Sequence, residues 1–178
     1  MNPDQRGATL ISSLLLLLVL TVLGLTAMQI SHMEERMAGN TRDLSIAFQG
    51  AEAALRNGEA LLRAQVARPV DCSAAPCLGA LPVWQAGVLE QVENEPSSWW
   101  DGGNALAFTD AAGNPAMPGQ AVDPTLVVEH LGFVRTDGGV EVGLAPPAGR
   151  DFYQITAHSD GASGNANVVL QSTFARKF

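Results

Sequence analysis

The sequence has few basic residues and no cluster of them. Lys and Arg together number 10 against 18 Asp and Glu, which gives a formal net charge of -8. A protein that binds nucleic acid needs a basic face to neutralise phosphates, so this balance argues against nucleic acid as a partner. The same acidity argues against a domain that lies flat on an anionic membrane surface.

The sequence motifs of common enzymes are missing as well. No G-x-S-x-G, H-E-x-x-H, phosphate-binding loop or dinucleotide fingerprint occurs. The histidines His32, His130 and His158 are scattered, so they predict no catalytic site and no metal site. The loops 101–104 and 110–114 hold oxygen ligands but lack the spacing of a calcium-binding loop, and turn formers explain them. We therefore expect a protein that is not an enzyme and that has no cofactor.

Cysteine is scarce, and the two cysteines, Cys72 and Cys77, lie close together in DCSAAPC. In an exported protein an isolated close pair is most simply a disulfide. The bridge would close a short loop and add about 2–3 kcal/mol of stability in the chain-entropy treatment. Two free thiols in a surface loop are the alternative. A zinc site is not expected, because two cysteines with no histidine nearby supply too few ligands.

A long apolar segment occupies the N-terminal part of the chain. From Gly7 to Met33 there is no Asp, Glu, Lys or Arg. The hydrocarbon core of a membrane needs only about 20 such residues, so a helix here spans it with length to spare. Arg6 precedes the segment, which favours an N-in, C-out orientation and places the chain after about residue 34 outside the cytoplasm.

Three interpretations of this segment compete. A cleavable secretory signal normally has an apolar region of about 7–15 residues, and this region is longer, although a weak small-residue site ends at Ala27. The second interpretation is a plain signal anchor. The third is a leader that is cleaved before the apolar helix, so that the helix is kept. The start MNPDQRG favours the third, because its polar residues end in Arg6-Gly7 directly against the apolar run. A glycine at the junction lets a peptidase draw in the backbone without side-chain obstruction.

This junction resembles the prepilin peptidase site of type IV pilins and type II secretion pseudopilins. The resemblance implies cleavage after Gly7 and N-methylation of the new terminus, Ala8. Two positions depart from the family pattern: the first mature residue is Ala8 in place of Phe, and the fifth is Ser12 in place of Glu. In the family this Glu neutralises the terminal amine of a neighbouring subunit inside the apolar filament core, where an unpaired amine is costly. Ser12 supplies no such charge, which points to a subunit at the tip or first position.

Beyond the membrane segment the chain is expected to continue as an amphipathic helix. Its apolar positions at helical spacing predict a packing stripe, and they include Met33, Met37, Leu44, Phe48, Ala51 and Leu55. Covering a β-sheet is one role for such a stripe. The sequence segments ERMAGN, AFQ and AEAALR follow the anchor in this order. With them, residues 5–63 resemble the PilX-type minor pilins. Gly39-Asn40 is a weak point that costs about 1 kcal/mol against Ala, and it marks either a bend or a segment that melts.

After the helix, residues 69–124 read as loop-rich. Pro69 is expected to end the helix, because proline lacks the backbone donor and clashes with the preceding turn. This region holds every tryptophan, at positions 84, 99 and 100. We expect them to pack the region onto helix and sheet, and an exposed Trp99-Trp100 anchor for a partner is the alternative. Segment 86–94 predicts a short helix.

Strand signals follow in the last third of the chain. Residues 125–135 are β-rich with a bulge expected at Gly132, and residues 140–144 are a candidate short partner strand. Residues 152–159 and 167–175 alternate well and flank the turn-rich loop DGASGNA. The segments YQITA and VVLQSTF within these two candidate strands also resemble the PilX-type minor pilins.

The expected fold class is α+β and pilin-like, with a long N-terminal helix packed on a small antiparallel β-sheet. The helix is expected to have a membrane-spanning half and an amphipathic half. The expected segments are a leader (1–7), a transmembrane helix (8–31), an amphipathic periplasmic half of the helix (32–68), a loop-rich region with the disulfide (69–124) and the sheet region (125–178).

The resemblance implies a minor pilin that primes type IV pilus assembly at the pilus tip and supports twitching motility and adhesion. It would be a single-pass inner-membrane protein with a periplasmic C-terminal domain before it reaches the cell surface. The implied partners are other minor pilins, the major pilin, the prepilin peptidase, the inner-membrane assembly platform and a tip adhesin. Two alternatives remain open: a tip pseudopilin of a type II secretion system, and a signal-anchored periplasmic binding protein or enzyme.

Overall fold

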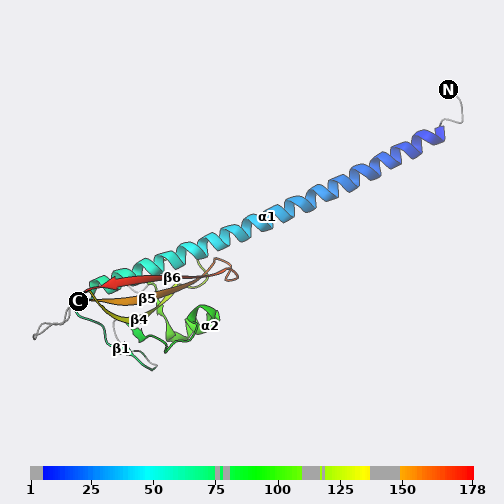
Figure 1. Cartoon of the computed structure of the whole chain (residues 1–178). Helices are drawn as coiled ribbons and strands as arrows, with labels where there is room; N and C mark the ends of the chain where they lie inside the picture. Colours follow the sequence, from blue (N-terminus) through cyan, green and yellow to red (C-terminus); the bar gives the residue numbers. More distant parts are fainter. Residues whose placement is uncertain (1–5, 75–76, 78–80, 110–116, 118, 137–148) are drawn as a thin grey trace, which may run out of the picture. The chain divides into compact units, whose positions relative to one another are not determined.

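The computed structural model describes residues 6–74, 77, 81–109, 117, 119–136 and 149–178 of the chain. The chain divides into two compact units, Met1–Arg42 and Asp43–Phe178. Helix α1 (Arg6–Ala64) supplies the first unit and continues into the second. The second unit, called the head below, also contains a six-stranded sheet (Figure 1).

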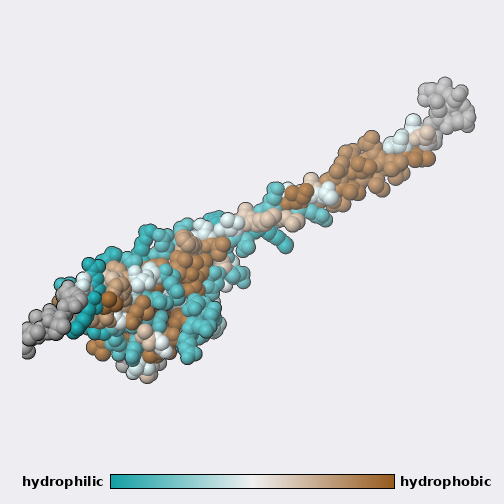
Figure 2. All heavy atoms as spheres, viewed as in Figure 1, coloured by the Kyte–Doolittle hydropathy of each residue, from teal (hydrophilic) through white to brown (hydrophobic). Residues whose placement is uncertain are grey.

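The first unit holds the apolar part of α1. By length and composition, α1 is the one helix among the described residues that could cross a membrane, and its apolar window is fully exposed. Figure 2 shows the apolar atoms that cover this part of the helix. The hydroxyls of Ser13, Thr21 and Thr26 donate to carbonyl oxygens three or four residues earlier, at 2.8 to 2.9 Å. These polar groups therefore need no water, as a membrane interior requires.

Within the head, α1 presents a face of mostly small residues to the sheet. The buried positions repeat at spacings of three and four, and they are Ala47, Gly50, Ala51, Ala54, Gly58 and Leu62. A Cβ atom added at Gly58 would lie 2.9 Å from Ile155 Cγ2, and one at Gly50 would overlap Gln120 Nε2 and Ser159 Oγ. The small residues thus let the helix backbone approach the sheet closely.

The sheet has the strand order β1-β2-β4-β5-β6, and β3 pairs with β4 outside this path. The three long strands β4 (Thr125–Arg135), β5 (Gly149–Asp160) and β6 (Asn167–Arg176) are antiparallel neighbours (Figure 1). β3 (Leu106–Ala107) is also antiparallel to β4. The α+β, pilin-like fold class is therefore confirmed.

The other edge of the sheet differs from the expectation of antiparallel strands alone. β1 (Asp71–Cys72) runs parallel to β2 (Val83–Gln85), and β2 runs parallel to β4. Both strands come from the region that the sequence marks as loop-rich. They are two and three residues long, too short to carry a period of their own, so only their pairing within the sheet, β1 with β2 and β2 with β4, makes them strands.

The expected long strands are confirmed with small changes at their ends. β4 has the predicted bounds, β5 begins three residues earlier and ends one residue later than predicted, and β6 is one residue longer. The register between β4 and β5 shifts between His130 and Gly132, which is the predicted bulge, and Gly132 has a φ of 137°. The candidate strand 140–144 lies outside the described residues.

Two helix predictions need correction. α1 ends at Ala64, before Pro69 is reached. The short helix over 86–94 is wrong except for the 3-10 turn η2 (Val92–Asn94), because Gly87 and Gln91 adopt positive φ values of 78° and 48° that interrupt a helix. Short helices α2 (Ser97–Trp99) and η3 (Trp100–Asn104) follow instead.

The head has a buried cluster on each side of β4. Leu126 and Val128 belong to the cluster that contains Ala54 and Leu62 of α1, whereas Val127 belongs to a second cluster with Trp84, Val92 and Trp100. Trp84 and Trp100 are buried, and Trp99 packs edge-on against Trp100 at 5.2 Å. The tryptophans therefore pack the irregular region onto the sheet, and the alternative of an exposed Trp99-Trp100 anchor is wrong.

Candidate functional site

The processing and assembly positions predicted at the N-terminus lie on α1. Ala8 and Ser12 are exposed in the first turns of the helix. The Ser12 hydroxyl donates to the carbonyl oxygen of Thr9 at 3.0 Å, so its hydrogen is used within its own helix. Gly7 is helical in its backbone, and residues 1–5 of the expected leader lie outside the described residues. Cleavage between Gly7 and Ala8 stays a prediction.

The predicted packing positions of α1 fall into two groups. Ala51 is buried against the sheet and Leu55 is half-buried beside the same core cluster. Met33, Met37, Leu44 and Phe48 remain between 49% and 60% exposed. The two innermost positions thus serve the head itself, and the role predicted for the other four in packing against neighbouring subunits stays a prediction.

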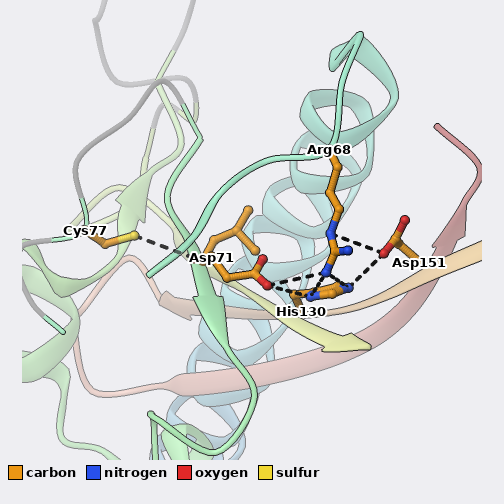
Figure 3. Close-up of polar contacts among 6 residues, drawn as sticks. Arg68, Asp71, Cys77, His130 and Asp151 are labelled. Atoms are coloured by element: carbon orange, nitrogen blue, oxygen red, sulfur yellow. Dashed lines mark hydrogen bonds and ion pairs between the residues drawn. The ribbon is translucent and has the colours of Figure 1, made fainter. Parts of the chain in front are cut away.

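A polar cluster, buried at His130 and Asp151 and partly exposed at Arg68 and Asp71, joins four separate segments of the head. Figure 3 shows Arg68, from the segment after α1, beside Asp71 of β1, His130 of β4 and Asp151 of β5. His130 Nδ1 lies 2.8 Å from Asp71 Oδ2, and His130 Nε2 lies 3.0 Å from Asp151 Oδ1. Arg68 Nη2 lies within 3.3 Å of both ring nitrogens, and Arg68 Nε is 3.4 Å from Asp151 Oδ1. We call these four residues the polar cluster.

The polar cluster is arranged for holding segments together and not for proton transfer to a substrate. Each ring nitrogen of His130 already has a carboxylate oxygen within hydrogen-bond distance. The His130 side chain is 5% exposed and that of Asp151 is 6% exposed, so a substrate has no free nitrogen to reach. The cluster instead fixes β1 and the segment after α1 to the centre of the sheet.

A second buried pair lies near the other end of β5. The His158 ring stacks on Trp100 at 5.0 Å, and its Nε2 lies 2.9 Å from Asn167 Nδ2 and 3.7 Å from Asp160 Oδ1. Burial lowers the pKa of His158 and raises the pKa of Asp160, because both charged forms lose water. Both side chains are less than 8% exposed, so this pair is also inaccessible to a substrate.

The disulfide expected from the sequence is present. Cys72 of β1 and Cys77 are bonded, with their Cα atoms 5.6 Å apart, and both pack against the cluster that contains Trp84. Cys77 Sγ also lies 3.7 Å from the carbonyl oxygen of Val83 (Figure 3). The bridge therefore ties Cys77 to β1, next to Val83 of β2.

Among the residues that the structure describes, no group of three or more His, Cys, Asp or Glu side chains is placed to hold a metal ion. The loop 110–114, which offers Asp110 and Asn114 as oxygen ligands, lies outside these residues. Sequence reasoning missed the polar cluster altogether, because its members are separated by up to 83 positions and no motif connects Arg68 to Asp151. The one available signal was His130 within a β-rich segment, where a buried histidine needs partners.

Comparison with protein families gives two matches that together cover most of the chain. The family model described as PilX N-terminal matches residues 6–56, and the model described as type IV pilus assembly protein PilX C-term matches residues 48–176. Comparison with curated proteins and with solved structures gives no match. The two family matches meet within α1, so one continuous pattern runs from the apolar helix to the end of β6. The chain belongs to the PilX family of type IV pilus assembly proteins, which are structural subunits.

Proposed function

We propose that this chain is a minor pilin that primes type IV pilus assembly and occupies a position at or near the pilus tip. The family assignment supports a role in pilus assembly. The observation that carries the finer proposal is Ser12, which stands where the family pattern has an acidic residue. A subunit at the first position of the filament has no subunit above it whose terminal amine must be neutralised, so it does not need that acid.

The mechanism follows from the cost of an unpaired charge in an apolar environment. A terminal amine inside the filament core is stable only beside a carboxylate. Ser12 offers a hydroxyl that already donates to Thr9, and it carries no negative charge. The chain therefore lacks the means to neutralise the amine of a subunit above it, while subunits with the acid can still add below.

Substituting Ser12 tests this mechanism directly. Immunogold labelling of wild-type pili is expected to mark tips only, whereas Ser12→Glu should add label along the shaft. Ser13→Glu is the matched control, because it adds the same charge one position away and should leave the label at the tip. Wild-type label spread along the shaft would refute the tip position.

Processing and assembly need separate measurements. Intact mass and N-terminal sequencing of the membrane-extracted protein should give a methylated chain that begins at Ala8 and depends on the prepilin peptidase. A chain that begins at Met1 would instead be a plain anchored protein. Deleting the gene should reduce surface pili and twitching, and unchanged piliation would contradict the proposal.

A tip pseudopilin of type II secretion is the second candidate function. The same missing acid at Ser12 fits such a subunit, since it too would have nothing above it. A strain that lacks the gene distinguishes the two functions. Loss of piliation with normal protein secretion supports the minor pilin, and loss of secretion with normal piliation supports the pseudopilin. The partners we propose are other minor pilins, the major pilin, the assembly platform and a tip adhesin.

A further inference from the structure

The two edges of the head sheet are built differently. At one edge β1 is two residues long and ends in the cysteine that forms the disulfide. At the other edge β6 is ten residues long and pairs with β5 over its whole length with no register shift. No described residue pairs with the outer side of β6. The sheet thus ends on one side in the two-residue strand β1, and on the other in the long strand β6, whose outer backbone groups have no partner strand among the described residues.

The open edge carries none of the usual protection against pairing. Natural edge strands are kept apart by charges, prolines, bulges or short length. β6 has no proline and no charged residue from Asn167 to Ala175, and its pairing shows no bulge. In an antiparallel strand, alternate residues direct their N–H and C=O groups away from the neighbour, so about half of β6 offers backbone groups outward.

The side chains of β6 continue the two-sided pattern of the sheet. On the face covered by α1 they pair with Ser159, Ala157, Ile155 and Tyr153 of β5, all of which are buried. These β6 residues are half-buried, and they are Val168, Leu170, Ser172 and Phe174. On the other face Asn167, Gln171 and Thr173 are exposed, and Val169 and Ala175 are half-buried. A strand added at this edge would find mostly apolar neighbours on the α1 side and a mixture of polar and apolar ones on the other.

One flank of α1 extends this apolar surface beside β6. Leu55 and Phe174 pack against the same core cluster, and the Arg63 guanidinium lies 5.1 Å from the centre of the Phe174 ring. Helical spacing places Phe48 on the same flank as Leu55 and Arg63, and its side chain is 49% exposed. Figure 2 shows apolar atoms gathered where α1 runs past the sheet of the head.

The charges on this flank are paired within the helix. Glu52 binds Arg56, and Glu59 binds Arg63 at 2.9 Å. Apart from Arg176 at the end of β6, whose guanidinium donates to carbonyl oxygens at the end of α1, the described charges on this flank are thus paired, and a charged segment would lose hydration with little compensation. An occupant of this edge should be extended and uncharged, with apolar residues at every second position.

We infer that β6 is a docking edge where a strand from a different subunit of the pilus joins the head sheet. A second copy of this chain fits less well. Within the head Asp43 lies beside the start of β6 and Leu62 beside its end, so two β6 strands paired antiparallel about a two-fold axis would point the two Asp43 ends in opposite directions, whereas under the proposed function the apolar segments that precede Asp43 enter one membrane. This inference rests on the proposed function, because the partner strand comes from another assembly subunit.

Hydrogen exchange on the full-length chain tests the docking edge. The chain is measured alone in detergent and again within pili purified through a tag on it. Alternate amides of β6 should exchange at least about ten-fold more slowly in the pili, while amides at the centre of β4 stay unchanged. Equal exchange of β6 in both states overturns the docking edge. Protection that grows with the concentration of the chain alone overturns the choice of a different subunit.

A pair of substitutions on β6 adds a functional readout. Leu170→Lys places a charge on the α1 side of the edge and should cut incorporation into pili about ten-fold, as inward charges on edge strands do. Gln171→Lys adds the same charge to the exposed face and should incorporate normally. Equal incorporation of both variants overturns the proposal. If circular dichroism shows Leu170→Lys unfolded, the wild-type exchange measurement decides alone.

These measurements separate the docking edge from the proposed function. If the tagged chain is absent from pili and its deletion leaves piliation normal, the proposed function fails. If the chain is in the pili but β6 exchanges freely, the function stands and the docking edge fails.

Discussion

Asp43 on α1 and Ser163 in the loop between β5 and β6 are held together by two hydrogen bonds. The backbone N–H of Ser163 donates to Asp43 Oδ1 at 3.0 Å, and its hydroxyl donates to Oδ2. Gly161 permits this approach, because a Cβ atom there would lie 2.8 Å from the Asp43 carbonyl oxygen. The contact joins the first residue of the head to the turn that leads into the open edge strand β6.

The Asp43 contact predicts a loss of stability in acid. The hydrogen bonds from Ser163 hold the pKa of Asp43 below its ordinary value of 3.8. A depressed pKa in the folded state contributes stability above pH 3.8, and this stability is lost as the pH falls through the folded value. Melting of the wild type should therefore fall towards that of Asp43→Asn below pH 4, with Glu35→Gln as a control that follows the wild type. A constant gap between wild type and Asp43→Asn down to pH 2 would contradict this.

Two glycines of α1 predict opposite results for the same substitution. Alanine favours a helix over glycine by about 1 kcal/mol. Gly39 has nothing within 4 Å of an added Cβ atom, so Gly39→Ala should raise helix content without lowering the melting temperature. At Gly50 the added Cβ atom would overlap Gln120 and Ser159. Making room there displaces the Gln120 amide, which donates to the Ile46 carbonyl oxygen and to Ser159 Oγ, so Gly50→Ala should lose about 1 kcal/mol in denaturant unfolding. Equal stability of both variants would show that the helix does not sit as closely on the sheet as described.

The long elements of this fold could be read from the sequence because each carries its own period. β4 has the predicted bounds, and β6 differs by one residue. β1, β2 and β3 could not be predicted, because strands of two or three residues hold no period and exist only through their pairing with a neighbour. The sequence predicts the end of α1 too late for a related reason. Pro69 marks the latest point to which a helix can continue, whereas α1 ends at Ala64, where the Arg176 side chain binds the carbonyl oxygens of Leu62 and Gln65.

Arg176 at the end of β6 is the residue that completes the C-terminus of α1. Its guanidinium donates to the carbonyl oxygens of Leu62 and Gln65 and lies 4.8 Å from the centre of the Phe178 ring. Arg176→Met keeps the apolar stem but removes both donors, and it should destabilise the head by about 1.5–3 kcal/mol. Lys177→Met, at an exposed neighbour, should change the unfolding free energy by less than about 0.5 kcal/mol. Similar losses for the two would mean that net charge, and not the cap, is responsible.

The candidate site was predictable only where it depends on local sequence. The junction at Gly7, the missing acid at Ser12 and the Cys72–Cys77 pair each lie within a few residues, so a pattern could mark them. The polar cluster depends on β1, β4 and β5 meeting in one register, and that register is a property of the folded sheet. The docking edge is likewise visible only once β6 is known to be the last strand.

Removing one acid from the polar cluster should destabilise the head. Asp151→Ala would leave the buried His130 ring without the acceptor at 3.0 Å and Arg68 without one of its two carboxylates. Leaving a buried polar group without its partner typically costs about 1–3 kcal/mol, and urea unfolding should show a loss of this size, because the Arg68 side chain is 47% exposed and water can replace part of its pairing. Asp151→Asn, which keeps an oxygen near His130, should lose less. Glu90→Ala on the surface serves as the control, and a matching small loss in Asp151→Ala would show that the cluster contributes little.

Removing the Tyr153 hydroxyl is expected to stabilise the head and to remove a loss of stability at high pH. The Oη atom is buried with no hydrogen-bond partner among the described residues, so Tyr153→Phe should be more stable by about 1–2 kcal/mol at neutral pH. Burial, with a smaller effect of Asp151, raises the pKa of Tyr153 from 10.0 to about 12. The folded state therefore holds the phenol proton more tightly than the unfolded state does. The free energy of unfolding is unaffected below pH 10 and falls as the pH rises from 10 towards 12.

The Phe variant should lack this alkaline loss, because it has no proton to release. Tyr153 is the one tyrosine of the chain, so the ultraviolet absorbance of its phenolate follows the ionisation directly in the wild type. We expect the absorbance to rise only as the head unfolds, with the two signals changing together between pH 10 and 12. Absorbance that rises near pH 10 while circular dichroism still reports a folded head would show that the Tyr153 hydroxyl is open to water.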